Sequence, residues 1–167
     1  MGVLIVAADF TYSYAVPQSI SNDLEQFITD NEETILIDLM GAVFYAAFKA
    51  DLTAKVPVTA KFLAIYNAFN EDFQNTIVKS KGMKEMLKGF IFFDFMRQIK
   101  YKNTTMGQVV NSADTSQNVS PGSLYKYLNE AVDTYNAIQL YIRSIAPEDY
   151  ITPVFNGGKK EIAIPFF

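Results

Sequence analysis

Residues 83–99 read MKEMLKGFIFFDFMRQI and form the most hydrophobic stretch of the chain. Between Phe90 and Met96 the stretch is apolar nearly all round, which is typical of a helix that the rest of the protein covers on most sides. It therefore predicts a central helix over residues 83–102, around which the other segments pack.

Apolar residues recur at helical spacing on both sides of this stretch. The helices that we expect cover residues 21–30, 32–52, 59–69, 83–102 and 123–146. The last of these carries an apolar seam, expected to pack antiparallel to another helix, at Leu124, Leu128, Ala131, Tyr135, Ile138, Ile142 and Ile145. Gly41 lies inside the second of these helices, where a glycine indicates close backbone packing or a kink. The sequence predicts a mainly α fold, a helical bundle of about four to five helices. The residues expected to pack in its core are Leu39, Gly41, Phe44, Phe90, Phe93, Leu128, Tyr135 and Ile138.

The remaining segments lack helical spacing. Residues 70–82 have no clean period and are expected to form a connection, and residues 103–122 form a long loop in which Met106 to Val110 could make a short strand. Two extended pieces around Asn156-Gly157-Gly158 would form a short β-hairpin near the C-terminus. The predicted organisation is an extended N-terminal arm (1–19), a helical domain (20–150) and an extended C-terminal arm (151–167).

The composition excludes several kinds of chemistry. The 167 residues are 50% hydrophobic, with 14 basic and 18 acidic side chains, a net charge of −4, and no His, Cys or Trp. Disulfides, thiolate chemistry and histidine-based catalysis or metal binding are therefore absent, and an acidic chain binds phosphate backbones poorly. The longest apolar run, Gly89 to Met96, is too short for a membrane span of about 20 residues. We expect a protein made in a cytoplasm, without cofactor, metal or membrane partner.

Asp94 is the one acidic residue expected to be desolvated, because it lies in the most hydrophobic helix. It could serve as a general acid with a perturbed pKa, or as the structural partner of Arg97 or a lysine. Acidic pairs such as Glu32-Glu33 are expected to act as helix caps or dipole partners. No catalytic constellation is found, so the sequence predicts a protein that is not an enzyme.

The long loop and the two ends of the chain carry more apolar residues than a solitary domain would place there. Phe10, Tyr12 and Tyr14 belong to this surplus in the N-terminal arm. We expect subunit or partner contacts at Met106, Val109, Val110, Asn111, Val119, Ile151, Val154, Phe155, Ile162, Ile164, Phe166 and Phe167.

Several motifs along the helical domain occur in a recognisable order: Leu39 to Tyr45 (LMGAVFY), Phe62 to Phe69 (FLAIYNAF), Gly82 to Phe95 (GMKEMLKGFIFFDF), Thr105 to Asn111 (TMGQVVN) before Asn118 to Ser120, and Tyr127 to Ile138 (YLNEAVDTYNAI). Together they resemble the head-to-tail connector (neck-ring, adaptor) proteins of tailed phages and prophages of Bacteroidetes, including the crAss-like group. The likeness covers roughly residues 20–150. The family commonly has Leu-Gly where this chain has Met40-Gly41, and often Gly at the position of Ala68.

This resemblance implies a non-catalytic structural protein of the virion neck. Members assemble as a homomeric ring, expected here to be twelve-fold to match a portal, and join the portal protein to the adjacent neck or tail protein. Genome DNA passes through the lumen without sequence-specific binding. The implied location is the head–tail junction of the virion, after assembly in the host cytoplasm.

The alternative is a non-catalytic helical protein-binding module, such as a regulatory or host-takeover protein. Such a module would remain a monomer or dimer in solution, whereas a connector would form a large ring with its portal.

Overall fold

The computed structural model describes residues 2–16, 21–73, 76–104, 107–110, 121–145 and Glu161. The described part is mainly helical, as predicted, and its short strands pair into three antiparallel hairpins. In chain order the elements are η1 (Ala7–Asp9), η2 (Tyr12–Tyr14), α1 (Ser21–Met40), α2 (Ala42–Ala50), β1 (Leu52–Thr53), β2 (Val56–Pro57), α3 (Ala60–Tyr66), β3 (Phe69–Phe73), β4 (Thr76–Ser80), α4 (Met83–Lys100), β5 (Tyr101–Thr104), β6 (Gly107–Val110) and α5 (Pro121–Ile145).

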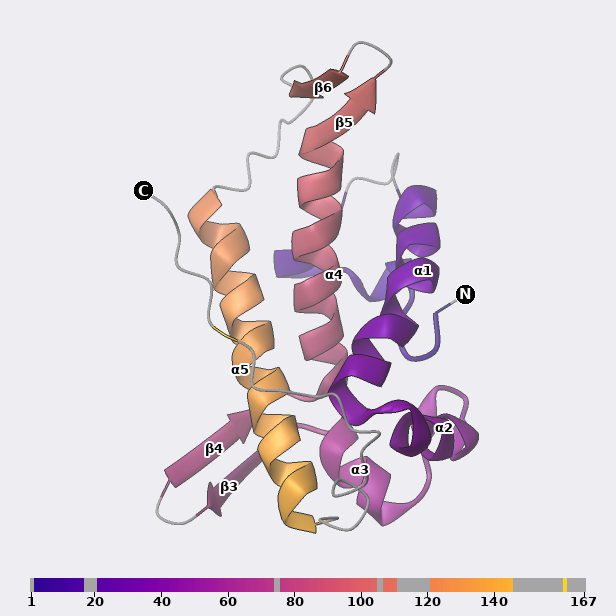
Figure 1. Ribbon diagram of the computed structural model, residues 1–167, viewed down its shortest axis with the longest axis vertical. Coiled ribbons are helices and arrows are strands. Elements are labelled where there is room, and N and C mark those ends of the chain that lie inside the picture. Colours follow the sequence, from indigo (N-terminus) through magenta and orange to yellow (C-terminus); the bar gives the residue numbers. More distant parts are fainter. Residues whose placement is uncertain are drawn as a thin grey trace.

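Helix α4 lies at the centre of the molecule, between α1 on one side and α5 on the other (Figure 1). Its apolar side chains from Met83 to Phe95 are buried, which confirms the prediction of a central, covered helix. Helices α4 and α5 run antiparallel, so that Phe90 contacts Tyr135 while Phe93, further along α4, contacts Tyr125. The seam predicted along the last helix is therefore the face that packs on α4.

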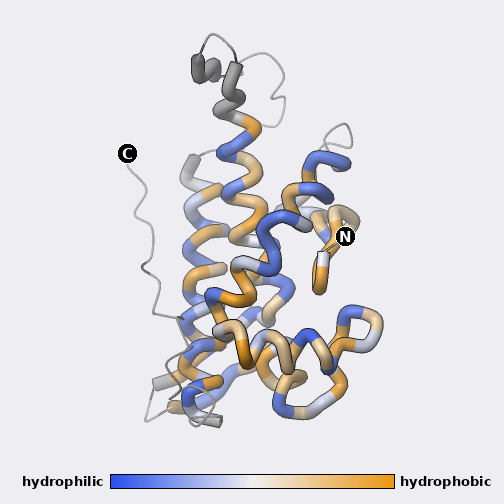
Figure 2. The backbone as a smooth tube through the Cα atoms, turned by 45° about the vertical axis from the view of Figure 1, so that its right-hand side comes forward, coloured by the Kyte–Doolittle hydropathy of each residue, from blue (hydrophilic) through white to orange (hydrophobic). Residues whose placement is uncertain are grey.

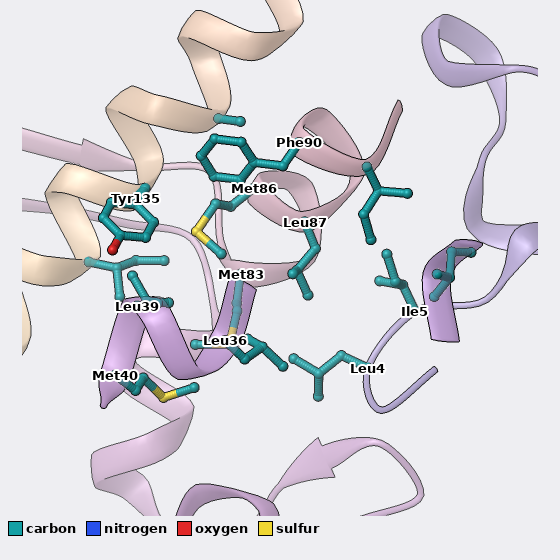
Figure 3. Close-up of a cluster of buried hydrophobic side chains, with 14 of the residues drawn as sticks. Leu4, Ile5, Leu36, Leu39, Met40, Met83, Met86, Leu87, Phe90 and Tyr135 are labelled. Carbon is teal, nitrogen blue, oxygen red and sulfur yellow. The ribbon is translucent and has the colours of Figure 1, made fainter. Parts of the chain in front are cut away.

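Side chains from four segments meet in the hydrophobic core (Figure 3). Leu36, Leu39 and Met40 of α1 point toward the residues of α4, Tyr135 comes from α5, and Leu4 and Ile5 come from the start of the chain. The labelled residues of α4 in this cluster are Met83, Met86, Leu87 and Phe90.

The residues predicted to form the core lie as follows. Leu39, Gly41, Phe44, Phe90, Phe93, Tyr135 and Ile138 are buried. Leu128 is half-buried and packs against the edge of the core cluster.

The expected helix break near Asp30 is wrong. Helix α1 runs without interruption from Ser21 to Met40, and the break falls at Gly41, which has φ 74° and ψ 156°. This backbone conformation is accessible almost only to glycine. The predicted kink is thus present, and it divides the expected 32–52 helix between the end of α1 and the short helix α2.

The expected connection over residues 70–82 instead contains the hairpin of β3 and β4, in which Phe69 pairs with Ser80 and Phe73 with Thr76. Phe69 and Phe73 lie on one face of it, and their rings contact Tyr141 of α5, with centroids 4.8 and 6.0 Å away. The acidic pair Glu71-Asp72 obscured this pattern in the sequence. In a strand, every second residue lies on the same face, and packing of that face against α5 makes the strand conformation favourable here.

The N-terminal arm is not a projecting extended segment. Residues 2–16, named here the N-terminal segment, include the two 3-10 turns η1 and η2 and lie against α1 and α4. The segment is drawn mainly in hydrophobic colours near the N label of Figure 2. Its side chains Leu4, Ile5, Phe10 and Tyr14 are buried.

The region predicted as a long loop includes part of the hairpin of β5 and β6, which follows directly from α4. Strand β6 occupies Gly107–Val110, where the sequence allowed a short strand. Residues 111–120, the C-terminal arm other than Glu161, and the hairpin expected within that arm lie outside the described residues.

Candidate functional site

The most distinctive polar feature of the structure is Glu32, whose residue is 1% exposed in the middle of the core face of α1. Its carboxylate accepts hydrogen bonds from three consecutive backbone amides of the N-terminal segment. The amide of Leu4 lies 2.7 Å and that of Ile5 3.1 Å from Oε1, while the amide of Val3 donates to Oε2. One buried side chain thus satisfies three backbone donors that have no strand partner.

A second carboxylate continues this arrangement along α1. Glu25, seven residues before Glu32 and therefore on the same face of the helix, accepts a hydrogen bond of 2.7 Å from the amide of Ala7. We call Glu25 and Glu32 the carboxylate clamp. It holds the N-terminal segment through hydrogen bonds to main-chain amides, which do not depend on the identity of the side chains.

Lys55 completes the clamp from the opposite side. Its Nζ donates to the carbonyl oxygens of Gly2, at 2.9 Å, and Ile5, at 3.4 Å. Lys55 sits in the turn between β1 and β2, where Ala54 and Lys55 have φ values of 50° and 68°. Two consecutive left-handed residues without glycine or asparagine are unusual in such a turn. Here they coincide with a lysine that contacts the N-terminal segment.

Gly2 fits the clamp because it lacks a side chain. A Cβ at this position would lie 2.3 Å from the carbonyl oxygen of Ile5 and 2.6 Å from Oε2 of Glu32. Both distances are far below van der Waals contact. Only glycine can occupy this position while the segment curls around the carboxylate.

Burial raises the pKa of Glu32 above its ordinary value, because the charged form loses its hydration. The three amides and the positive charge of Lys55 oppose this rise, since they stabilise the carboxylate. The described residues contain no group of three or more His, Cys, Asp or Glu suited to a metal ion. The arrangement is suited to holding a peptide backbone.

The sequence interpretation of Glu32 as a helix cap or dipole partner is wrong. The signal that could have revealed it is the four-residue spacing of Leu24, Ile28, Glu32, Leu36 and Met40, all buried in the structure. A carboxylate buried within an apolar stripe is stable only when hydrogen-bond donors lie close to it. Here those donors come from a segment 27 to 29 residues earlier in the chain.

The side chain of Asp94 is exposed on α4, yet the desolvation expected from the sequence is present in part. Partial desolvation by its surroundings still raises the pKa of Asp94, and the charge of Arg97 opposes that rise. Arg97 itself lies over the ring of Phe93, 5.4 Å from its centroid. The charge interaction with Arg97 agrees with the structural role expected for this pair.

Among the predicted interface residues, the structure places Val109 and Val110 in β6. Val109 pairs with Lys102 and Val110 with Tyr101 of β5. The other predicted interface residues lie outside the described part of the chain: Met106, Asn111, Val119, Ile151, Val154, Phe155, Ile162, Ile164, Phe166 and Phe167.

Sequence reasoning missed one exposed apolar surface, on α2. This helix buries Phe44, Tyr45 and Phe48, yet its other face is also apolar, and Val43 there is 66% exposed. The remaining exposed apolar residues of this face are Ala42, Ala46, Ala47 and Ala50. Lys49 is also exposed on α2, so this face is a small surface made mainly of alanines beside a charged residue.

Comparison with protein-family models, with curated proteins and with solved structures gave no match to this chain. Among the described helices, none has both the length and the apolar character that crossing a membrane requires.

Proposed function

We propose that the protein is a non-catalytic structural component of a phage neck. In this role it forms a homomeric ring, twelve-fold to match a portal, that joins the portal protein to the next neck or tail component and surrounds the DNA channel. The observation that carries the proposal is the ordered set of motifs along residues 20–150, which resembles the head-to-tail connector family.

The hairpin of β5 and β6 supports this role. It extends α4 beyond the helical body at one end of the molecule (Figure 1), and β5 contacts α4. An isolated two-stranded hairpin is marginally stable in water, and its outer edges offer free backbone groups to a strand of another chain. A projecting hairpin of this kind is suited to a subunit that contacts a neighbour in a ring.

The acidic character of the chain is compatible with a DNA channel. A net charge of −4 favours repulsion of a passing duplex, which lets DNA slide without being gripped. No sequence-specific contact to DNA is part of the proposal.

The direct test mixes the purified protein with the portal protein encoded in the same genome and examines the mixture by cryo-electron microscopy. We expect a closed ring seated on the portal, and light scattering should show the corresponding large particle. Absence of the protein from the neck of intact virions would contradict the proposal.

A second test separates the contact segments from the helical body. Replacing residues 102–109 with a short glycine-serine turn, or deleting residues 151–167, should abolish portal docking while far-UV circular dichroism stays close to that of the wild type. As a matched control, a conservative change in the other hairpin, Ile77→Thr, should leave docking intact, since Ile77 is exposed. Unfolding of the tail deletion would assign that segment to the core instead.

The exposed face of α2 also suits the alternative function, a helical protein-binding module. The two functions differ in the size of the assembly. A module would remain a small species with or without portal protein, whereas a connector should become a large ring when the portal is present.

A further inference from the structure

We propose that the groove occupied by residues 2–16 is a peptide-binding site that also accepts the same segment from a second copy of this chain. The proposal concerns the contact between copies and stands whether or not the protein belongs to a phage neck. Its basis is that the groove already holds a peptide of defined chemistry, namely the chain's own N-terminal segment.

The groove has the two properties of a peptide site, backbone recognition and side-chain pockets. Glu32, Glu25 and Lys55 bind only main-chain atoms of the segment. Tyr14 supplies an aromatic anchor, since its ring packs against both Phe92 and Tyr127, with centroids 5.6 and 5.0 Å away.

The buried side chains of the segment define which peptide fits at this place. Leu4 and Ile5 are fully buried and Phe10 is nearly so, which requires large apolar side chains at these positions. Position 2 tolerates no side chain, because Glu32 and the carbonyl oxygen of Ile5 lie too close to it. A peptide with this pattern is found in the protein itself, so a second copy is the partner of matching chemistry.

Exchange between copies would preserve every contact that the structure shows. Residues 17–20 join the segment to the helical body, and its partners lie beyond that connection, in α1, the β1–β2 turn, α4 and α5. The same hydrogen bonds and apolar contacts therefore form whether the segment comes from its own chain or from a neighbour. Exchange becomes favourable when copies are held at high local concentration.

The left-handed residues around the groove fit this interpretation. Tyr12, with φ 52° and 97% exposure, lies between the buried anchors Phe10 and Tyr14, and Ala54 and Lys55 are left-handed as well. Tyr12 lies within the seated segment, so it keeps this conformation whichever chain supplies the segment.

The test uses two full-length variants with complementary defects. Gly2→Val prevents a chain's own segment from seating but leaves its groove intact, whereas Glu32→Ala damages the groove but leaves the segment intact. When the two are mixed, the segment of the Glu32→Ala chain should enter the groove of the Gly2→Val chain. Native mass spectrometry should then detect a mixed pair that exceeds any homodimer of either variant alone.

Matched controls use exposed positions next to the same elements, Ala8→Val in the segment and Glu33→Ala in α1. Both control chains keep their own segments seated, so their mixture should form no excess of mixed pairs. Two folded test variants, as judged by circular dichroism, that form no mixed pair would overturn the proposal.

Hydrogen exchange of the wild-type protein tests the proposal if a variant fails to fold. The amides of Val3, Leu4 and Ile5 should exchange through a local opening that requires less free energy than exchange in the middle of α4. If these amides exchange only as fast as those of α4, the segment opens only with global unfolding and cannot be transferred between copies.

Discussion

At the residue scale, Glu32 and Glu33 illustrate how two adjacent identical side chains acquire different roles. Glu33 is exposed and pairs with Lys49 at 2.8 Å, while Glu32 faces the core and binds the N-terminal segment. Adjacent residues on a helix lie about 100° apart, so only one of them can occupy the buried stripe. Glu32 is the one that lies on the buried stripe of α1.

We predict that Glu32→Ala lowers the free energy of unfolding by about 3 kcal/mol, because three buried amides lose their acceptor. Urea denaturation followed by circular dichroism measures this change. Glu33→Ala removes only an exposed ion pair and should change stability by less than about 1 kcal/mol. Equal effects of the two substitutions would show that the clamp contributes nothing beyond surface charge.

At the element scale, the close approach of α4 and α5 depends on Gly89. A Cβ there would lie 2.7 Å from Cβ of Ala131 and 2.9 Å from the carbonyl oxygen of Tyr127. Glycine weakens an isolated helix by about 1 kcal/mol relative to alanine. Glycine at this position therefore lowers the intrinsic helix propensity of α4 but allows α4 and α5 to pack closely.

We predict that Gly89→Ala destabilises the protein despite the gain in helix propensity, by roughly 1–3 kcal/mol, because the clash forces α4 and α5 apart. Gly122→Ala provides the matched comparison, since no atom lies within 4 Å of a Cβ there. It should be neutral or stabilising by up to about 1 kcal/mol. Thermal unfolding of both variants gives the two signs directly, and stabilisation by Gly89→Ala would contradict the packing seen here.

At the scale of the whole molecule, tyrosines join distant parts of the chain. The hydroxyl of Tyr135 on α5 donates to the backbone oxygen of Asp38 at 3.0 Å, near the end of α1. Burial raises the pKa of Tyr14 and of Tyr135 well above the ordinary value, and raises the pKa of Tyr45 to about 12. All three lie in or beside the core that the helices share.

We predict that stability is lost at alkaline pH through these groups. A tyrosine whose pKa is raised by folding stabilises the folded state fully below its unfolded pKa of about 10, and that contribution disappears as the pH rises through the folded pKa. Near-ultraviolet absorbance of phenolate should therefore show Tyr14, Tyr45 and Tyr135 ionising only as the protein unfolds.

One substitution assigns this signal. Tyr135→Phe should reduce the phenolate absorbance that appears on unfolding and should lower stability, since the hydrogen bond to Asp38 is lost. Ionisation of Tyr14, Tyr45 and Tyr135 while the protein remains folded would contradict their buried positions.

The sequence by itself determined the helical class, the central position of residues 83–99, the antiparallel seam of the last helix and the kink at Gly41. These features follow from periodicity and from the backbone preferences of glycine, which act within a few residues. The α4–α5 face of the core was predictable for the same reason, because helical spacing shows which side of each helix is apolar.

Only the tertiary structure decided the clamp around Glu32, the hairpin of β3 and β4, and the seating of the N-terminal segment. Each depends on a partner distant in the sequence, such as Glu32 for Leu4 or Tyr141 for Phe69. Local propensity does not encode such partners, because a buried polar group or a short strand becomes favourable only when its partner is already in place. The same reasoning explains why the apolar residues near the start of the chain were expected to reach toward neighbours, although several of them lie within the core of their own chain.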